Sequence, residues 1–160
     1  MTALNFLVQE DQICFAIDTL SISADDRLPS GYLTKFIFLP HLSTVVTGTG
    51  HGTFINEWMN FVRGKIIAKD IDHLNEYVPQ ALNEIAEQFP ELGDITATVY
   101  HFGFSIRRNI YTGYAYRSVN EWRSEELKPG TGLKPPIDVD LNKNYKLPEK
   151  FRRSRIISAI

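Results

Sequence analysis

Residues 33–52 read Leu33-Thr-Lys-Phe-Ile-Phe-Leu-Pro-His-Leu-Ser-Thr-Val-Val-Thr-Gly-Thr-Gly-His-Gly52, and the other predicted elements follow from this stretch. Two runs rich in β-branched and aromatic residues flank Pro40-His41, which predicts a β-hairpin. From Thr53 onward, apolar residues recur every three or four positions, which predicts an amphipathic helix with Thr53 as its N-cap and Gly64 at its end. The stretch therefore leads from a hairpin through a glycine-rich turn into a helix.

Similar hairpin patterns lie before and after this stretch. Residues 3–8 and 13–17 are apolar runs around a polar turn, and residues 95–104 and 110–116 form another such pair. Residues 18–33 are polar and contain turn-forming residues, so we expect a loop there.

A second helix is predicted from Asp70 or Asp72 to Phe89, because its apolar residues fall three or four positions apart on one face. Pro79 lies within this pattern. Since proline is poorly accommodated in a helix interior, we expect a break near Val78.

The composition narrows the functional classes. The chain has 160 residues, is 43% hydrophobic and carries a formal net charge of −2, which predicts one globular domain with no general affinity for nucleic acid or membrane surfaces.

Cys14 is the single cysteine and lies in an apolar run, so we expect it to be buried and to form neither a disulfide nor a metal site. The four histidines have no metal-binding spacing, and His51 is expected to be a solvent-facing turn residue. With neither a signal peptide nor a membrane span in the pattern, we place the protein in the cytoplasm.

The composition changes near residue 125. We expect residues 1–125 to form the core domain and residues 126–160 an irregular extension that packs on the core or is exchanged between cores. Residues 128–136 are rich in proline and glycine and are predicted to form no packed element. Residues 150–155 are a short basic segment, typical of a solvated tail.

The order of hairpins around a helix pair predicts an α+β fold with mainly antiparallel sheets and helices on one face. Within this order, Thr2 opens the first strand, Asp18 follows the second, Lys35 opens the third, and Gly48-Thr49-Gly50 precedes the first helix. In these positions the chain resembles the N-terminal nucleophile (Ntn) hydrolases, and among them the proteasome β-subunit type. The resemblance implies a sandwich of two antiparallel sheets with flanking helices.

The resemblance also implies roles for these residues. Thr2 would be the nucleophile and, through its own α-amine, the base; Lys35 would tune that amine, and Asp18 would orient Lys35. Gly50 would supply an oxyanion donor, while Gly48, Thr49 and Ser21 would contact a peptide or small amide substrate. The amine is free only if Met1 has been removed. No cofactor and no metal are implied. Gly130-Thr131-Gly132 could stand for a later hydroxyl-bearing loop of the family.

Two functions remain open: a threonine-dependent amide hydrolase or peptidase, and a catalytically silent assembly or binding module. A third alternative is nucleotide or phosphate binding at Gly48–Gly52, but the third glycine of the dinucleotide fingerprint would fall at Thr53. The family pattern continues with more helices and strands than residues 123–160 can supply. We therefore expect a sandwich shortened at its C-terminus, with an exposed apolar sheet face that a homo-oligomer covers.

Overall fold

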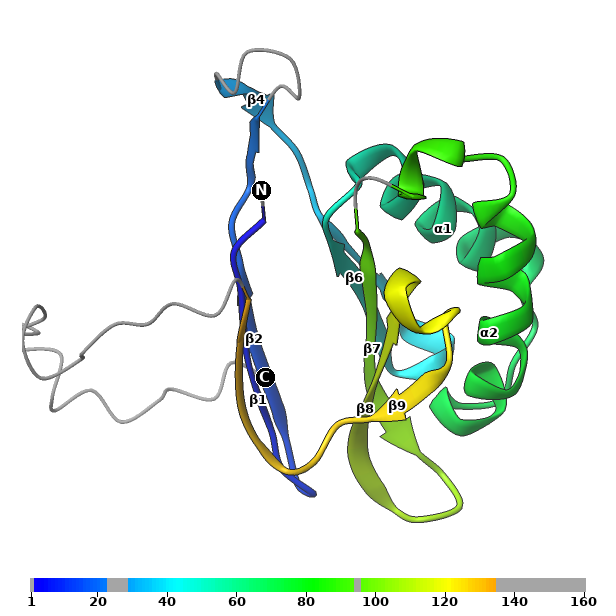
Figure 1. Ribbon diagram of the computed structural model, residues 1–160. Helices are drawn as coiled ribbons and strands as arrows, with labels where there is room; N and C mark the ends of the chain where they lie inside the picture. The colour runs from blue at the N-terminus through cyan, green and yellow to red at the C-terminus, as the bar shows by residue number, and fades with distance from the viewer. Residues whose placement is uncertain (1, 23–28, 94–95, 135–160) are drawn as a thin grey trace, which may run out of the picture.

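The computed structural model describes residues 2–22, 29–93 and 96–134 and shows an α+β fold of three layers (Figure 1). Two α-helices cover one face of a five-stranded sheet, and a three-stranded sheet lies against the other face. All strand pairs in the described residues are antiparallel. The predicted fold class, antiparallel sheets with flanking helices, is confirmed.

The five-stranded sheet has the strand order β5-β6-β7-β8-β9. Two of its hairpins match the predicted hairpins, and a short helical turn at Pro40–Leu42 joins the first pair. The strands are β5 (Phe36–Leu39), β6 (Thr44–Thr49), β7 (Thr98–Ser105), β8 (Ile110–Arg117) and β9 (Ser124–Glu126).

The three-stranded sheet has the order β10-β1-β2. Strands β1 (Leu4–Val8) and β2 (Ile13–Ile17) form the first predicted hairpin. Strand β10 (Gly130–Lys134) pairs with β1, so the prediction that residues 128–136 contain no packed element is wrong. The proposed division at residue 125 stays a prediction, and the basic segment 150–155 lies outside the described residues.

Strands β3 (Leu20–Ile22) and β4 (Pro29–Tyr32) form a small antiparallel ribbon where we predicted a loop. The sequence pattern was misleading because β4 is exposed throughout and has no buried apolar face. In Figure 1 the ribbon extends beyond the end of the three-stranded sheet, and the chain returns from it into β5.

Helix α1 (Gly52–Lys65) begins two residues earlier than predicted, with His51 as its N-cap in place of Thr53, and Gly64 lies inside it. Helix α2 (Ile71–Ala86) begins where predicted, with Asp70 as its N-cap. The Asp70 carboxylate accepts a hydrogen bond from the His73 N–H at 2.9 Å, which satisfies one of the free donors at the helix start.

Helix α2 continues past Pro79 without a break, so the predicted interruption near Val78 is wrong. Proline removes one backbone hydrogen bond, but Val78, Leu82 and Ile85 on the same helix are buried against the sheet. This packing offsets the lost bond. The Asn83 side chain also donates a hydrogen bond to the Pro79 carbonyl at 2.9 Å.

Alternation along β7 divides the core into two clusters. Val99 faces the helices, whereas Tyr100 and Phe102 lie between the two sheets, together with Phe6 from β1. On the helix side, the Trp58 indole donates a hydrogen bond to His101 Nε2 at 3.0 Å. Burial lowers the pKa of His101 to about 3, so this histidine is a neutral core residue.

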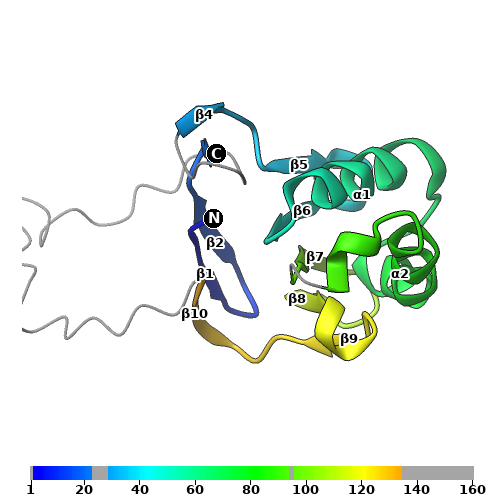
Figure 2. The same ribbon diagram turned by 45° about the horizontal axis from the view of Figure 1, so that its top comes forward.

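The outer face of the three-stranded sheet is uncharged and exposed. None of the elements that the structure describes forms a layer over it (Figure 2). Cys14 lies on this face and is exposed, which corrects the prediction that it is buried: the inward positions of β2 alternate with it. The face consists of Asn5, Leu7, Cys14, Ala16, Thr131 and Leu133.

Candidate functional site

Asp18 fixes the start of β1 beside the end of β2. Its Oδ1 accepts a hydrogen bond from the Ala3 N–H at 2.8 Å, and its own N–H donates to the Ala3 carbonyl at 3.1 Å. These two bonds hold the residue that follows Thr2, and so they limit where Thr2 can lie. The other carboxylate oxygen of Asp18 remains available to a cation.

Lys35 supplies that cation from the segment just before β5. Its Nζ donates to Asp18 Oδ2 at 3.0 Å and to the Leu20 carbonyl at 2.5 Å. The Lys35 side chain is only 13% exposed, so the pair is largely shielded from solvent. The Thr47 hydroxyl donates to the Lys35 carbonyl at 2.7 Å, which ties the lysine backbone to β6.

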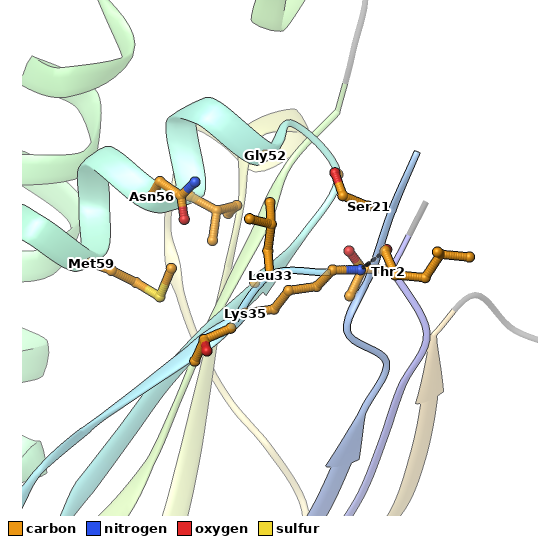
Figure 3. Close-up of a pocket in the computed structure, with 12 residues that line it drawn as sticks. Thr2, Ser21, Leu33, Lys35, Gly52, Asn56 and Met59 are labelled. Atoms are coloured by element: carbon orange, nitrogen blue, oxygen red, sulfur yellow. Dashed lines mark hydrogen bonds between the residues drawn. The ribbon is translucent and has the colours of Figure 1, made fainter. Parts of the chain in front are cut away.

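The segments around Thr2 and Lys35 line a common pocket of about 110 Å³. Figure 3 shows the Lys35 side chain extending toward Thr2, with Ser21 beside Thr2 and with Asn56 and Met59 across the pocket on α1. Lys35 is the one charged residue among those that line it. The lining residues are Thr2, Leu20, Ser21, Leu33, Thr34, Lys35, Gly48, Gly50, Gly52, Ile55, Asn56 and Met59.

Two glycines at the junction between β6 and α1 have crowded surroundings. Gly50 has a φ of 102°, and a Cβ there would lie 2.0 Å from the Thr96 carbonyl oxygen. A Cβ at Gly48 would lie 2.4 Å from the end of the Ile55 side chain. Both glycines line the pocket and expose backbone to it. Thr49, which pairs with Thr98 in the sheet, is not among the lining residues.

The structure thus gathers six of the seven residues singled out from the sequence around one site. Thr2, Lys35, Ser21, Gly48 and Gly50 line the pocket, and Asp18 lies behind it, bonded to Lys35. The suggestion that Gly130-Thr131-Gly132 stands for a hydroxyl-bearing loop near Thr2 is wrong. This segment pairs with Phe6–Val8, toward the other end of β1, so Thr131 is not part of the site.

Sequence reasoning missed the pocket wall on α1. Ile55 and Met59 lie about one turn apart and line the pocket with Asn56, but the spacing of Ile55 and Met59 is typical of any buried helix face. His51 was also misjudged. It is half-buried, its Nδ1 accepts a hydrogen bond from the Phe54 N–H at 3.2 Å, and its ring packs against Phe89.

Other kinds of site have less support. Strand β6 is antiparallel to both of its neighbours, whereas a dinucleotide site at Gly48–Gly52 would need a parallel crossover. In the described ranges, no three His, Cys, Asp or Glu side chains form a group that could hold a metal ion. No helix among the described residues is long and apolar enough to span a membrane.

Comparisons with known proteins identify the fold. No protein-family model matches the chain, and no curated protein matches it by sequence. Among solved structures, Anbu (ancestral beta-subunit) from Yersinia bercovieri matches with a TM-score of 0.57 and 11% identity, over 83% of this chain and 60% of that chain. Anbu from Hyphomicrobium sp. strain MC1 gives the same values.

A Gly-1 mutant of Anbu from Hyphomicrobium sp. strain MC1 matches with a TM-score of 0.59 and 16% identity, over 96% of this chain and 65% of that chain. The chain therefore spans 60% to 65% of the length of these structures. At such identities the likeness shows the fold alone, and that fold is the proteasome-like Ntn fold expected from the sequence.

Proposed function

We propose that the chain is a threonine-dependent N-terminal hydrolase that cleaves a peptide or small amide. One observation carries the proposal: Thr2, the Asp18-bonded Lys35 and the glycine turn are distant in sequence but meet at one pocket. A strand start, a lysine and a glycine turn are each common. Their convergence on a pocket beside the chain start is what N-terminal nucleophile chemistry requires.

The Thr2 hydroxyl needs a base, and its own α-amine can serve once Met1 has been removed. The reference pKa of an α-amine is about 7.7 to 8.0, so roughly a tenth to a sixth of it is neutral at pH 7 and can accept the hydroxyl proton. The Lys35 ammonium beside it disfavours a second positive charge on that amine. Asp18 holds the ammonium in place through the 3.0 Å hydrogen bond.

In the proposed reaction, the Thr2 oxygen bonds to the carbonyl carbon of the amide while its proton passes to the α-amine. The resulting oxyanion is stabilised by backbone N–H at the glycine turn, where Gly50 and the start of α1 meet. The carbon–nitrogen bond then breaks, and the leaving amine takes the proton. Water hydrolyses the acyl-threonine ester in the second half of the reaction.

The pocket wall indicates the substrate. Leu33, Ile55 and Met59 are apolar, and the ammonium of Lys35, the one charged group in the lining, is already bonded to Asp18 and the Leu20 carbonyl. We expect the pocket to accept an uncharged side chain and to disfavour an acidic or basic one, because neither charge would find an unpaired partner.

Hydrolysis of N-capped fluorogenic peptide amides by protein lacking Met1 tests the proposal. We expect cleavage after an uncharged residue such as leucine, none in Thr2→Ala, and measurable cleavage in the matched control Thr2→Ser, which keeps the hydroxyl. Equal rates in wild type and Thr2→Ala would contradict the proposal, as would no cleavage by protein with a confirmed free Thr2.

A catalytically silent assembly module is the second candidate, and the uncharged outer sheet face favours it. Uncovered faces of this kind usually mark interfaces, so we expect a homo-oligomer under either function. Light scattering at micromolar concentration should show an oligomer that Leu133→Asp disrupts. Ile67→Asp, at an exposed residue between the helices, is the control. A monomeric wild type would count against the interface.

Intact mass of the protein from its native host separates the two functions. Met1 retained in the whole population would exclude the hydrolase, because an acylated α-amine is not a base, and would leave the assembly role.

A further inference from the structure

His51 lies at the junction between the glycine turn and α1. It follows Gly50 and is the N-cap of α1, in extended backbone conformation with φ −69° and ψ 106°. It is not among the residues that line the pocket. Any effect of this side chain on the site would therefore pass through its neighbours.

A hydrogen bond and a ring contact hold the His51 side chain. Its Nδ1 accepts from the Phe54 N–H at 3.2 Å, and the ring meets Phe89 edge-on with 5.8 Å between centroids. The His51 carbonyl accepts the first helical hydrogen bond, from the Ile55 N–H at 3.1 Å. Both the side chain and the backbone of His51 thus attach the turn to the first turn of α1.

On the other side of His51, Gly50 is held against the backbone of Thr96 and Ala97. Gly50 therefore lies between the segment just before β7 and a capped helix. With the side-chain cap removed, the His51 carbonyl would still accept from the Ile55 N–H, but the hydrogen bond to the Phe54 N–H and the ring contact with Phe89 would be lost. The backbone of Gly50 would then be less restrained on the helix side. Histidine is not a favoured N-cap, since Ser, Thr, Asn and Asp satisfy the same donors with shorter side chains, so the cap alone does not explain the choice of residue.

We infer that His51 is a positioning residue for the oxyanion donors of the glycine turn: its Nδ1 cap on Phe54 and its packing on Phe89 hold the Gly50 backbone in place. The inference rests on the proposed function of the site. Small displacements of such donors are costly, since a shift of about 1 Å can lower a rate by about 100-fold.

The test uses the full chain lacking Met1 and an electrophilic peptide probe, with acylation of Thr2 followed by intact mass. For His51→Ala we expect the limiting rate of acylation to fall about 10-fold or more, with the probe concentration at half-maximal rate unchanged, because donors act on the transition state. His51→Asn, which keeps a cap acceptor, should recover most of the rate.

His73→Ala is the matched control. His73 lies at the start of α2, its Nδ1 also accepts a backbone N–H at 3.2 Å, and its ring also meets an aromatic ring, that of Tyr77. It should acylate as fast as wild type. An unchanged rate in His51→Ala would overturn the inference.

Backbone ¹⁵N relaxation of residues 49–52 provides a readout independent of activity. His51→Ala should lower the order parameters of this turn, while His51→Asn and His73→Ala should leave them at wild-type values. If wild type with a free Thr2 is not acylated, the proposed function fails, and the relaxation data alone decide whether His51 positions the turn. Unchanged order parameters in His51→Ala would then refute it.

Discussion

Two acid–base clusters lie at opposite ends of the five-stranded sheet. At one end, Lys35 has two partners and a pocket beside it. At the other end, Asp72 on α2 accepts hydrogen bonds from Ser105 and Tyr114 at 2.5 and 2.7 Å and pairs with Arg108 at 3.0 Å. Arg108 also binds Glu126 at 2.5 Å.

The difference lies in what surrounds each charge. The Asp72 carboxylate accepts hydrogen bonds from Ser105 at the end of β7, Arg108 in the β7–β8 turn and Tyr114 on β8, so it links α2 to the sheet. The Asp18–Lys35 pair borders a pocket that also contains Thr2. A saturated cluster stabilises the fold, whereas a cluster with a free side can act on a substrate.

The largest expected effect is at the pocket. Lys35→Met should reduce Thr2 acylation about 100-fold or more, because the ammonium that lowers proton affinity at the amine is lost. The free energy of unfolding should also fall, by about 1 to 3 kcal/mol, because Asp18 Oδ2 and the Leu20 carbonyl lose their shared donor. Probe kinetics and urea denaturation measure the two quantities. A variant that acylates normally would remove Lys35 from the proposed mechanism.

At the other end, stability should fall without a loss of acylation. Asp72→Ala leaves Arg108, Ser105 and Tyr114 without their shared acceptor, so the free energy of unfolding should fall by about 2 to 3 kcal/mol. Acylation of Thr2 should stay within about threefold of wild type. Loss of acylation in a variant that is still folded would show that the two clusters are coupled.

The acid dependence of stability gives a smaller effect. Burial raises the pKa of Asp72, but hydrogen bonds from Ser105 and Tyr114 and the charge of Arg108 outweigh it and hold the pKa below its usual 3.8. A lowered folded-state pKa stabilises the protein above the unfolded-state value, and the contribution is lost as the pH falls through the folded-state value. The stability difference between wild type and Asp72→Asn should therefore be constant near neutral pH and shrink below 3.8. A difference that does not change on acidification would contradict the lowered pKa.

The smallest effect is expected at a solvent-exposed ion pair. Arg123 and Glu121 are 3.1 Å apart, but their side chains are 81% and 77% exposed. Arg123→Ala should change the free energy of unfolding by less than about 0.5 kcal/mol and leave acylation unaltered. A larger loss of stability would contradict the account, in which an exposed ion pair stabilises the fold much less than the Asp72 cluster does.

The strands and helices with clear periodicity could be predicted from the sequence, and those without it could not. Strand β10 was missed because Gly130 and Gly132 occupy its inward positions and give no apolar alternation. Glycine is needed there, since a Cβ at Gly132 would lie 2.1 Å from the Phe6 ring. The exposed outer face of the three-stranded sheet could be predicted only through the family resemblance, which implies further elements that residues 123–160 are too few to supply.

The candidate site was predictable where residue type and position in the element order coincide, as at Thr2, Asp18 and Lys35. Their hydrogen bonds were not, because the Lys35 bond to the Leu20 carbonyl depends on how the β3–β4 ribbon returns to β5. The half-buried placement of His51 was missed, since its ring packs against Phe89, which is far away in sequence.

Site mapping of a covalent adduct tests the central claim most directly. Protein with a free Thr2 amine is treated with the electrophilic peptide probe, and fragment masses locate the modification. We expect one adduct per chain, on Thr2, which is absent from Thr2→Ala and from protein that retains Met1. An adduct only on another nucleophile such as the exposed Cys14, or equal labelling of Thr2→Ala, would contradict the account.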